Sequence, residues 1–211
     1  MKRKSDYLPV ALKVAGKKLL IVGGGEVAYR KFIQWQDRGA NITVVASEFC
    51  VHFEHVEEVF EWVSLLLRPF KAEDLAACDL VYIATNNSVI NAEIEALCQS
   101  HRIWCARADQ AESDFQSLSL IEHGPIQIAI GTSGQAPSVA LLIKEDIENE
   151  FDWEFLERKI ELMAALKQKL KQDVVDQSHR RALLGHALGL TIDELERLMT
   201  DETFYSGYKR Q

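Results

Sequence analysis

The chain has 211 residues, of which 47% are hydrophobic and 27% charged, and its net charge is −8. This is the composition of a folded globular protein with one large domain, or one domain and an appendage, and it excludes a collagen-like, low-complexity or disordered chain. The acidic balance argues against nucleic acid or an anionic membrane as a partner, and no apolar run approaches the roughly 20 residues of a membrane span.

The N-terminus and the cysteines indicate the compartment in which the protein works. The basic start, residues 1–4, is followed by the polar segment Ser5–Pro9 and not by an apolar stretch, so we expect no export signal. The four cysteines show no Cys-x-x-Cys spacing, which speaks against a disulfide framework or a zinc site. They are Cys50, Cys78, Cys98 and Cys105. We therefore expect a cytoplasmic protein with reduced cysteines.

Between Lys18 and about Asp109, five short apolar runs alternate with segments of helical periodicity. Continuous apolar runs are typical of parallel strands that helices cover on both faces. The runs are Leu19–Val22, Ile42–Val45, Val63–Leu66, Leu80–Ala84 and Ile103–Ala106. The helical periods come from Ala28, Phe32 and Trp35, and from Ile90, Ile94 and Leu97. This pattern predicts a Rossmann-type parallel sheet of the α/β class.

The pattern changes after Asp109. Leu118–Ile121 and Ile126–Ile130 flank a His-Gly-Pro turn, which predicts a hairpin, and residues 140–150 resume a helical period. From Asp152 onward the chain has no proline and includes a Thr191 to Glu194 capping box, so we expect helices. The expected division is a nucleotide-binding domain over residues 1–113, a small α+β module over 114–150 and a helical domain over 151–211.

A glycine loop follows the first predicted strand and opens the first predicted helix. Gly23-Gly24-Gly25-Glu26-Val27-Ala28 matches the dinucleotide-binding pattern G-x-G-x-x-A. Gly23 permits the tight turn, Gly25 lets the backbone approach a pyrophosphate, and Ala28 lets the helix pack closely while its N-terminus faces the phosphates. A glycine turn that only packs a helix on a strand is the alternative.

Two further segments are expected at the cofactor. Glu48 follows the second predicted strand, 23 residues after Gly25, where it would meet an adenosine ribose or remain a solvated carboxylate. Thr85, Asn86 and Asn87 close the fourth strand, where open α/β sheets bind ligands, although an asparagine there could also cap the next helix. Because no Lys or Arg directly follows the second strand, NAD is favoured over NADP.

These residues, with others in the same order, resemble the precorrin-2 dehydrogenase family of sirohaem biosynthesis. That family includes the amino-terminal part of sirohaem synthase and a fungal dehydrogenase/chelatase. The resemblance covers roughly residues 5 to 150, in the segments Tyr7–Val10, Leu12–Lys13, Gly16–Lys17, Val22–Ala28, Arg30–Lys31, Gly39–Ala46, Ala84–Asn87, Asp109, Gly124–Ile130 and Gly131–Pro137. It implies oxidation of precorrin-2 to sirohydrochlorin with NAD, and a homodimer whose middle module, 114–150, mediates dimerisation.

The resemblance also suggests which residues handle the substrate. Asp109 matches the functional aspartate of the family, which could accept a proton or hold the pyrrole nitrogens of the macrocycle; the alternative is a carboxylate that caps a turn. Thr132, Ser133 and Ser138 match a Ser/Thr-containing loop that contacts the tetrapyrrole. The chain departs from the family around Asp114-Phe115, where the flanking Cys and Pro are missing. Candidate cations for the substrate carboxylates are Arg30, Lys31, Arg107 and Lys144, each of which could equally be solvated surface.

Three rival interpretations remain. The first adds ferrochelatase activity, although the six histidines form no His-Glu-x-x-His motif and no cysteines pair, so we predict no stable metal site. The second is a regulatory domain that senses NAD without catalysing a reaction. The third is a short-chain dehydrogenase, whose Tyr-x-x-x-Lys signature occurs at Tyr205 and Lys209. We interpret that match as coincidence, because it follows the helical part and Gly207 interrupts it.

Overall fold

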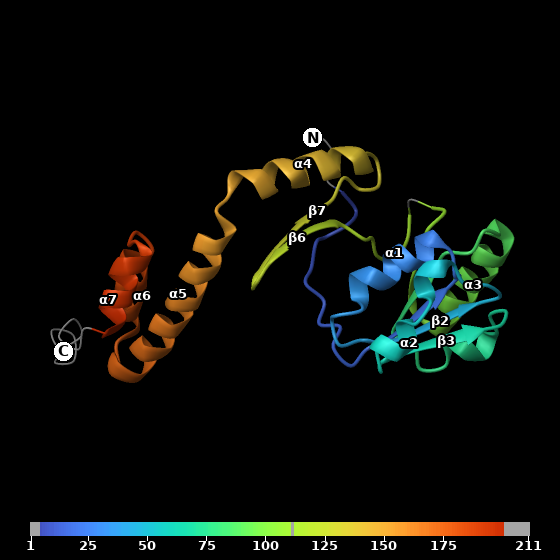
Figure 1. The fold of residues 1–211 in the computed structure, drawn as a ribbon, viewed down its shortest axis with the longest axis horizontal. Coiled ribbons are helices and arrows are strands. Elements are labelled where there is room, and N and C mark those ends of the chain that lie inside the picture. Colours follow the sequence, from blue (N-terminus) through green and yellow to red (C-terminus); the bar gives the residue numbers. More distant parts are fainter. Residues whose placement is uncertain (1–4, 111, 201–211) are drawn as a thin grey trace. The chain divides into compact units, whose positions relative to one another are not determined.

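The computed structural model describes residues 5–110 and 112–200, which form two compact units (Figure 1). The first unit comprises the chain up to Leu118 together with Gly131–Pro137, and the second comprises Ser119–Ile130 together with the chain from Ser138 onward. Tyr205 and Lys209 lie outside the described residues.

The first unit is built on a parallel five-stranded sheet with the order β3-β2-β1-β4-β5. Its strands are β1 (Lys18–Val22), β2 (Asn41–Ala46), β3 (Val63–Leu67), β4 (Leu80–Ile83) and β5 (Trp104–Arg107). Val22 is in register with Val45 on one side and with Ile83 on the other, and Ile83 is in register with Arg107. The expected Rossmann-type α/β sheet is confirmed, with each strand within two residues of its predicted position.

Two apolar layers cover the sheet, one on each face. On one face, α1 (Glu26–Trp35), the short 3-10 helix η1 (Val51–Phe53) and α2 (Val56–Val59) enclose the fully buried rings of Phe32 and Phe53. On the other, the 3-10 helix η2 (Ala72–Leu75) and α3 (Ser88–His101) enclose Ile94 and Cys98. Coverage on both faces explains why the strands are continuously apolar.

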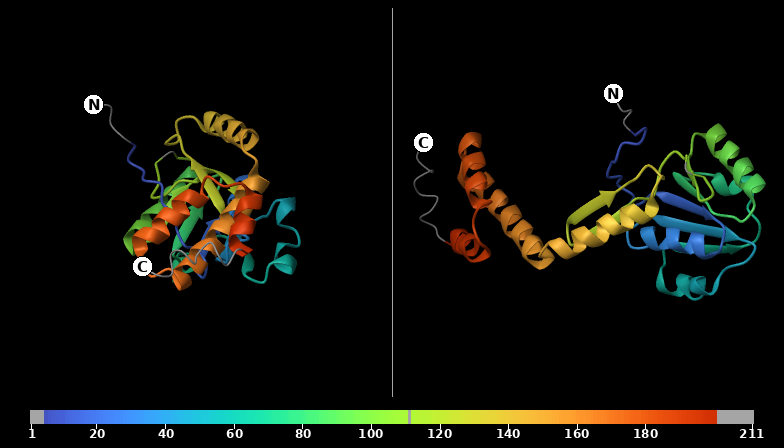
Figure 2. Two further views of the ribbon diagram at one scale, coloured as in Figure 1. Left: turned by 90° about the vertical axis from the view of Figure 1, so that its left-hand side faces the viewer. Right: turned by 90° about the horizontal axis from the view of Figure 1, so that it is seen from above.

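Within the described residues, the second unit contains the predicted hairpin and the helices α4 to α7 (Figure 2). The elements are β6 (Ser119–His123), β7 (Ile126–Ile130), α4 (Pro137–Glu150), α5 (Trp153–Asp173), α6 (Gln177–Ala187) and α7 (Ile192–Thr200). The capping box at α7 is present, since Thr191 N–H donates to Glu194 Oε2 and Glu194 N–H donates to Thr191 Oγ1. Helices α5, α6 and α7 enclose an apolar core of their own around Leu166, Leu170 and Leu195. No helix in the described part of the chain is long and apolar enough to cross a membrane.

Candidate functional site

The carboxyl edge of the parallel sheet brings together four segments that the sequence singles out. Gly23 follows β1, Glu48 follows β2, Thr85 follows β4 and Asp109 follows β5. Because the strands are parallel and in register at their ends, these segments meet at one edge of the sheet. Successive strands are added on one side of β1 up to β3 and on the other side from β4 onward, so the strand order reverses between β1 and β4. Open α/β sheets bind ligands in the crevice at such a switch point.

The three consecutive glycines of the loop meet different surroundings. Gly23 has a φ of +124°, and a Cβ there would stand 2.3 Å from the carbonyl oxygen of Ala84. A Cβ on Gly24 would stand 2.1 Å from the carbonyl oxygen of Glu48. A Cβ on Gly25 would meet no atom of the described chain within 4 Å. The first two glycines therefore allow close backbone packing, whereas Gly25 borders open space that a pyrophosphate can enter.

The N-terminus of α1 is also free to receive an anion. Its N-cap residue, Gly25, supplies no side-chain cap for the amides of the first turn. Ala28 is fully buried against the sheet, while Val27 is exposed and Glu26 lies 3.5 Å from the His52 ring nitrogen Nε2. Uncapped N–H groups and the helix dipole suit a phosphate group, so this end of the sheet fits a dinucleotide.

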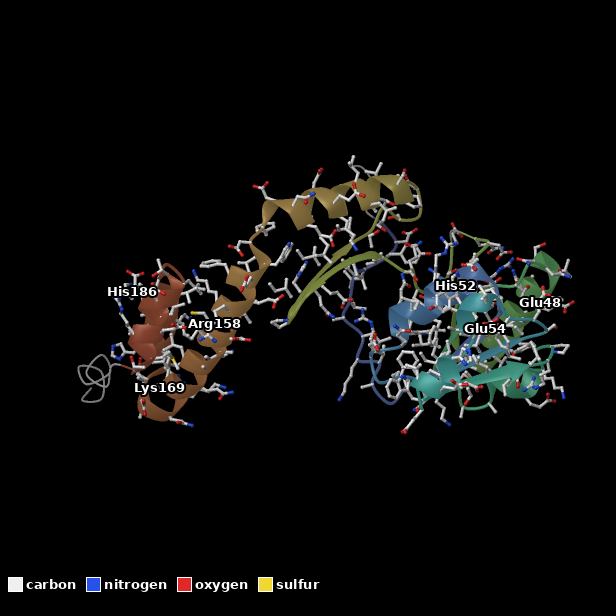
Figure 3. All side chains as sticks on the ribbon, in the orientation of Figure 1. Glu48, His52, Glu54, Arg158, Lys169 and His186 are labelled. Carbon is white, nitrogen blue, oxygen red and sulfur yellow. The ribbon has the colours of Figure 1, made fainter. Side chains whose placement is uncertain are left out.

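The segment that carries Glu48 is fastened to the glycine loop. Gly23 N–H donates to the Val45 carbonyl at 2.9 Å, and Cys50 N–H donates to the Gly24 carbonyl at 2.8 Å. These bonds place the backbone of Glu48 against Gly24, with its side chain exposed at the surface of the same unit as α1 (Figure 3). Rossmann domains commonly hold the adenosine ribose with a carboxylate after the second strand, and the contact of Glu48 with a ribose stays a prediction.

The β4–α3 turn uses its polar side chains on the protein itself. Asn87 Oδ1 accepts from the N–H groups of Val89 and Ile90, at 3.0 and 3.2 Å, and thereby caps α3. The Thr85 hydroxyl donates to the Oδ1 atom of Asn91, and the Asn91 amide donates to the Thr85 carbonyl at 3.2 Å. Asn86 is exposed and has no polar partner within the described residues. The capping alternative is thus realised by Asn87, and Asn86 is the amide left free to meet a ligand.

Asp109 is held by a buried arginine two residues earlier in the chain. Arg107 Nε donates to Asp109 Oδ1 at 3.0 Å and Arg107 Nη2 to Oδ2 at 2.8 Å. This bidentate bond lowers the pKa of Asp109 to about 2; desolvation opposes the shift, and the Asn91 amide adds to it. Arg107 Nη1 donates to Glu95 Oε2 on α3 at 2.9 Å. Asp109 is consequently an oriented carboxylate anion at neutral pH.

Arg107 corrects one sequence-based expectation. A solvated arginine available to a substrate carboxylate was one candidate role, but its side chain is only 5% exposed and is already paired with Asp109 and Glu95. Its pKa is raised by these two carboxylates, that of Asp109 first. Burial of an arginine is tolerated only with such partners. The position at the end of a core strand decides its burial, and the sequence pattern gives no sign of its second partner on α3.

The other candidate cations differ in their surroundings. Lys144 Nζ lies 3.6 Å from Glu148 one helical turn away, and Arg30 is exposed on α1. Lys31 lies over the Tyr82 ring, with Nζ 5.4 Å from the ring centroid. Desolvation, and to a smaller extent the charge of Arg30, lower the pKa of Lys31.

The loop that departs from the family pattern closes the free edge of β5. The Asp114 carboxylate accepts from Cys105 N–H at 2.9 Å, and Asp114 N–H donates to the Cys105 carbonyl at 3.1 Å. Ser113 Oγ accepts from Arg107 N–H at 3.0 Å. Phe115 packs edge-to-face on Tyr82 with ring centroids 5.0 Å apart. Asp114 and Phe115 therefore have a structural role, which explains why this pair fits the fold without its usual neighbours.

The three predicted substrate contacts fall in two parts of the chain. Thr132 and Ser133 lie in the loop before α4, where Thr132 Oγ1 accepts from Ala136 N–H at 3.3 Å and Ser133 Oγ lies 2.7 Å from Ser5 Oγ. Ser138 is exposed in the first turn of α4 and belongs to the second unit. Their contact with a substrate stays a prediction.

Asn91 and Glu95 are site residues that the sequence reasoning missed. Asn91 is 1% exposed, and it occupies the inward face of α3 that it shares with Ile94 and Cys98. An asparagine in a series of core-facing positions was the available signal, because a buried amide needs hydrogen-bond partners. Within residues 5–110 and 112–200, no three His, Cys, Asp or Glu side chains are grouped to hold a metal ion.

Comparisons with known proteins agree with this geometry. A family model described as "Putative NAD(P)-binding" matches residues 10–119. Siroheme synthase 2 of Yersinia enterocolitica is 33% identical over 203 residues, which are 93% of this chain and 41% of that protein. Siroheme synthase 1 of Yersinia pestis is 34% identical over 177 residues, 83% of this chain and 37% of the relative. The chain thus spans about two fifths of the length of these relatives.

A solved structure shows the same fold. The structure of "SirC, precorrin-2 dehydrogenase" superposes with a TM-score of 0.72 at 23% identity, and the match covers 92% of this chain and 99% of that one. Because the match covers 92% of this chain, it includes residues of both compact units.

Proposed function

The chain belongs to the NAD(P)-binding family whose model covers residues 10–119, and we propose that it is a precorrin-2 dehydrogenase that uses NAD to form sirohydrochlorin. The observation that carries the proposal is the shared sheet edge, where a glycine loop open to a pyrophosphate lies beside strand β4 and Asp109 stands beyond β5. The siroheme synthase relatives and the SirC fold support this substrate class.

Different residues of the chain bind the cofactor and the substrate in this proposal. The uncapped N-terminus of α1 and Gly25 bind the pyrophosphate, Glu48 accepts hydrogen bonds from the ribose, and Asn86 lies at the edge of the crevice. The bound nicotinamide supplies the hydride acceptor. The carboxylate of Asp109 contacts the macrocycle, where it can accept hydrogen bonds from the pyrrole N–H groups. A reducing cytoplasm suits the four free thiols.

NAD fits better than NADP at the ribose. The segment after β2 offers Glu48, and the residues that follow it, Phe49 and Cys50, carry no positive charge. A carboxylate accepts hydrogen bonds from the two ribose hydroxyls of NAD and repels the 2′-phosphate of NADP.

A homodimer is the expected assembly, formed by the hairpin and α4. Helix α4 exposes four large apolar side chains within five residues, Val139, Leu141, Leu142 and Ile143, and buries only Ala140. An apolar helix face of this kind needs a cover, and a second copy of the module supplies one.

The test is an anaerobic absorbance assay with precorrin-2 and NAD, together with a calorimetric titration of NAD and NADP. We expect NADH and the sirohydrochlorin spectrum to appear together, and NAD to bind more tightly than NADP. The Asp109→Asn variant is expected to keep NAD binding and to lose turnover, because the carboxylate does not touch the glycine loop.

Asp79→Asn is the matched control for this variant. Asp79 precedes β4 at the opposite edge of the sheet and pairs with Lys17 at 2.9 Å, so its loss should leave turnover unchanged. Full activity of Asp109→Asn would exclude Asp109 from the reaction. NAD binding by the wild type without any oxidation of precorrin-2 would favour an NAD sensor instead.

A further inference from the structure

Arg107 is a buried cation whose role the family resemblance does not supply. It ends β5, and its guanidinium reaches two carboxylates, Asp109 through two hydrogen bonds and Glu95 through one. The Gln110 side-chain amide also lies beside the guanidinium, 3.0 Å from Nη1, and it accepts from Nη1 in the orientation that turns its oxygen toward the arginine. A planar guanidinium bonded through Nε and Nη2 fixes both the position and the plane of the carboxylate that it holds.

The orientation of Asp109 has a second support. Asn91, buried on α3, bonds to the Thr85 hydroxyl and carbonyl and also contributes to holding Asp109 in its ionised form. Asp109 thus lies between a strand and a helix of the same compact unit, with its side chain still 32% exposed. A carboxylate held in this way can meet a ligand without reorganising.

We infer that Arg107 is a positioning residue that holds Asp109 as a permanent anion, so that Asp109 stabilises positive charge on the macrocycle and does not take its proton. This inference rests on the proposed function. A carboxylate with a pKa of about 2 is a weak base at neutral pH, because the pKa of an effective general base lies near the pH at which it works. The same ionisation makes it a constant negative charge.

The proposed step balances in electrons and protons. A C–H bond of precorrin-2 breaks and its hydrogen leaves with both electrons to the oxidised nicotinamide, which leaves one positive charge on the macrocycle. Asp109 faces that charge, and the macrocycle then loses a proton to water. The sum is two electrons and one hydrogen transferred to the nicotinamide, and one proton released to the solvent.

The charged neighbours of Asp109 agree with a site that stabilises a cation. Arg107 and Glu95 are the charged partners, and with Asp109 they form a cluster of net charge −1. The nearby thiol of Cys105 has a pKa raised by its hydrogen bond with Cys98 and by burial, so it stays neutral. The cluster therefore has one net negative charge, although it contains an arginine, and this charge can stabilise a cation that develops on the macrocycle.

The first experiment follows the titration of Asp109 itself. The method is carboxyl-carbon NMR on protein with labelled aspartate, in which the Asp109→Asn variant identifies the Asp109 signal. In the wild type this signal should not titrate above about pH 3, whereas in Arg107→Met its titration midpoint should rise to roughly pH 4. An Asp109 that titrates at the same pH in both proteins would overturn the role of Arg107. This readout needs neither precorrin-2 nor NAD.

The second experiment measures turnover in the same variants. At pH 7.5 the Arg107→Met protein should lose about tenfold or more in kcat, since the carboxylate is no longer oriented. Below about pH 5 its activity should fall further as the carboxylate takes up protons, a limb that the wild type lacks. A base role predicts the reverse at pH 7.5, because a higher pKa makes a better proton acceptor.

Arg68→Met is the matched control. Arg68 also holds an aspartate through two hydrogen bonds, from Nη1 and Nη2 to Asp74 at 2.8 and 2.6 Å, and it follows β3, four strands away from β5 in the sheet. It should raise the pKa of Asp74 and leave both Asp109 and turnover unchanged. An equal loss of turnover in this variant would show that loss of any ion pair weakens the enzyme, and would overturn a specific role for Arg107.

Arg107→Lys keeps the test decisive if the methionine variant does not fold. Lysine keeps the charge and loses the planar fork, so Asp109 should stay ionised while turnover still falls. Wild-type turnover in Arg107→Lys would overturn the positioning role. A wild type that is inactive on precorrin-2, but whose Asp109 responds to Arg107→Met as described, would refute the proposed function and leave the control of Asp109 by Arg107 supported.

Discussion

Three adjacent glycines in one loop serve different purposes. Gly23 and Gly24 have no room for a side chain, because backbone atoms of Ala84 and Glu48 occupy the space of a Cβ. Gly25 has room, and that room faces outward. The fold therefore requires the first two glycines, whereas under the proposed function the third keeps the approach to a pyrophosphate open.

This difference leads to a paired prediction. Gly25→Val should leave the thermal midpoint nearly unchanged and weaken NAD binding by about tenfold or more, since the side chain fills the approach to the α1 N-terminus. Gly23→Ala should lower the free energy of unfolding by roughly 2 kcal/mol or more, because a φ of +124° and the Ala84 carbonyl both reject a Cβ. Differential scanning calorimetry and NAD titration separate the two effects. Unaltered NAD affinity in Gly25→Val would contradict the assignment of the loop.

At the scale of elements, the sequence predicts best where local periodicity decides the structure. The five strands, the hairpin and the long helices appear where apolar periods place them, because each buries a face in a core. The short helices η1, η2 and α2 have too few residues for a period. The pairing of Arg107 with Glu95 depends on how α3 packs beside β5, and no local pattern contains that information.

The segment after β5 illustrates an element whose role only the structure shows. Asp114 and Ser113 supply side-chain oxygens to N–H groups on the free edge of β5, in place of a sixth strand. Tyr7 anchors this segment, since its hydroxyl donates to the Ser113 carbonyl at 3.0 Å. An unpaired strand edge is thereby covered within the unit.

Asp114→Ala tests this edge. The substitution leaves Cys105 N–H without its acceptor, so the free energy of unfolding should fall by about 1–3 kcal/mol. Hydrogen exchange should show faster exchange at the Cys105 amide, while β1 and β2 keep their protection. Unchanged exchange at Cys105 would mean that the carboxylate does not protect the strand edge.

At the scale of the whole molecule, the chain contains apolar cores that share no residues. Two cover the faces of the sheet, and a third lies among α5, α6 and α7. The third includes Leu162, Leu166 and Leu170, three residues of one stripe along α5 at intervals of four. Because these cores are separate, damage to the helical core should not pass directly to the nucleotide-binding edge.

Leu166→Ala measures this independence. Leu166 is 1% exposed, and its truncation should destabilise the helical part by about 2–5 kcal/mol, through lost burial and the cavity that remains. In the 211-residue chain we expect helical circular dichroism to be lost at a lower temperature, whereas the NAD affinity at 25 °C stays at the wild-type value. The contact of α5 with the hairpin, where His123 stacks on Trp153 with ring centroids 4.4 Å apart, lies more than three helical turns from Leu166 and should persist. Weakened NAD binding in this variant would show that the helical core is coupled to the cofactor site, and would require a path from α5 to the sheet edge.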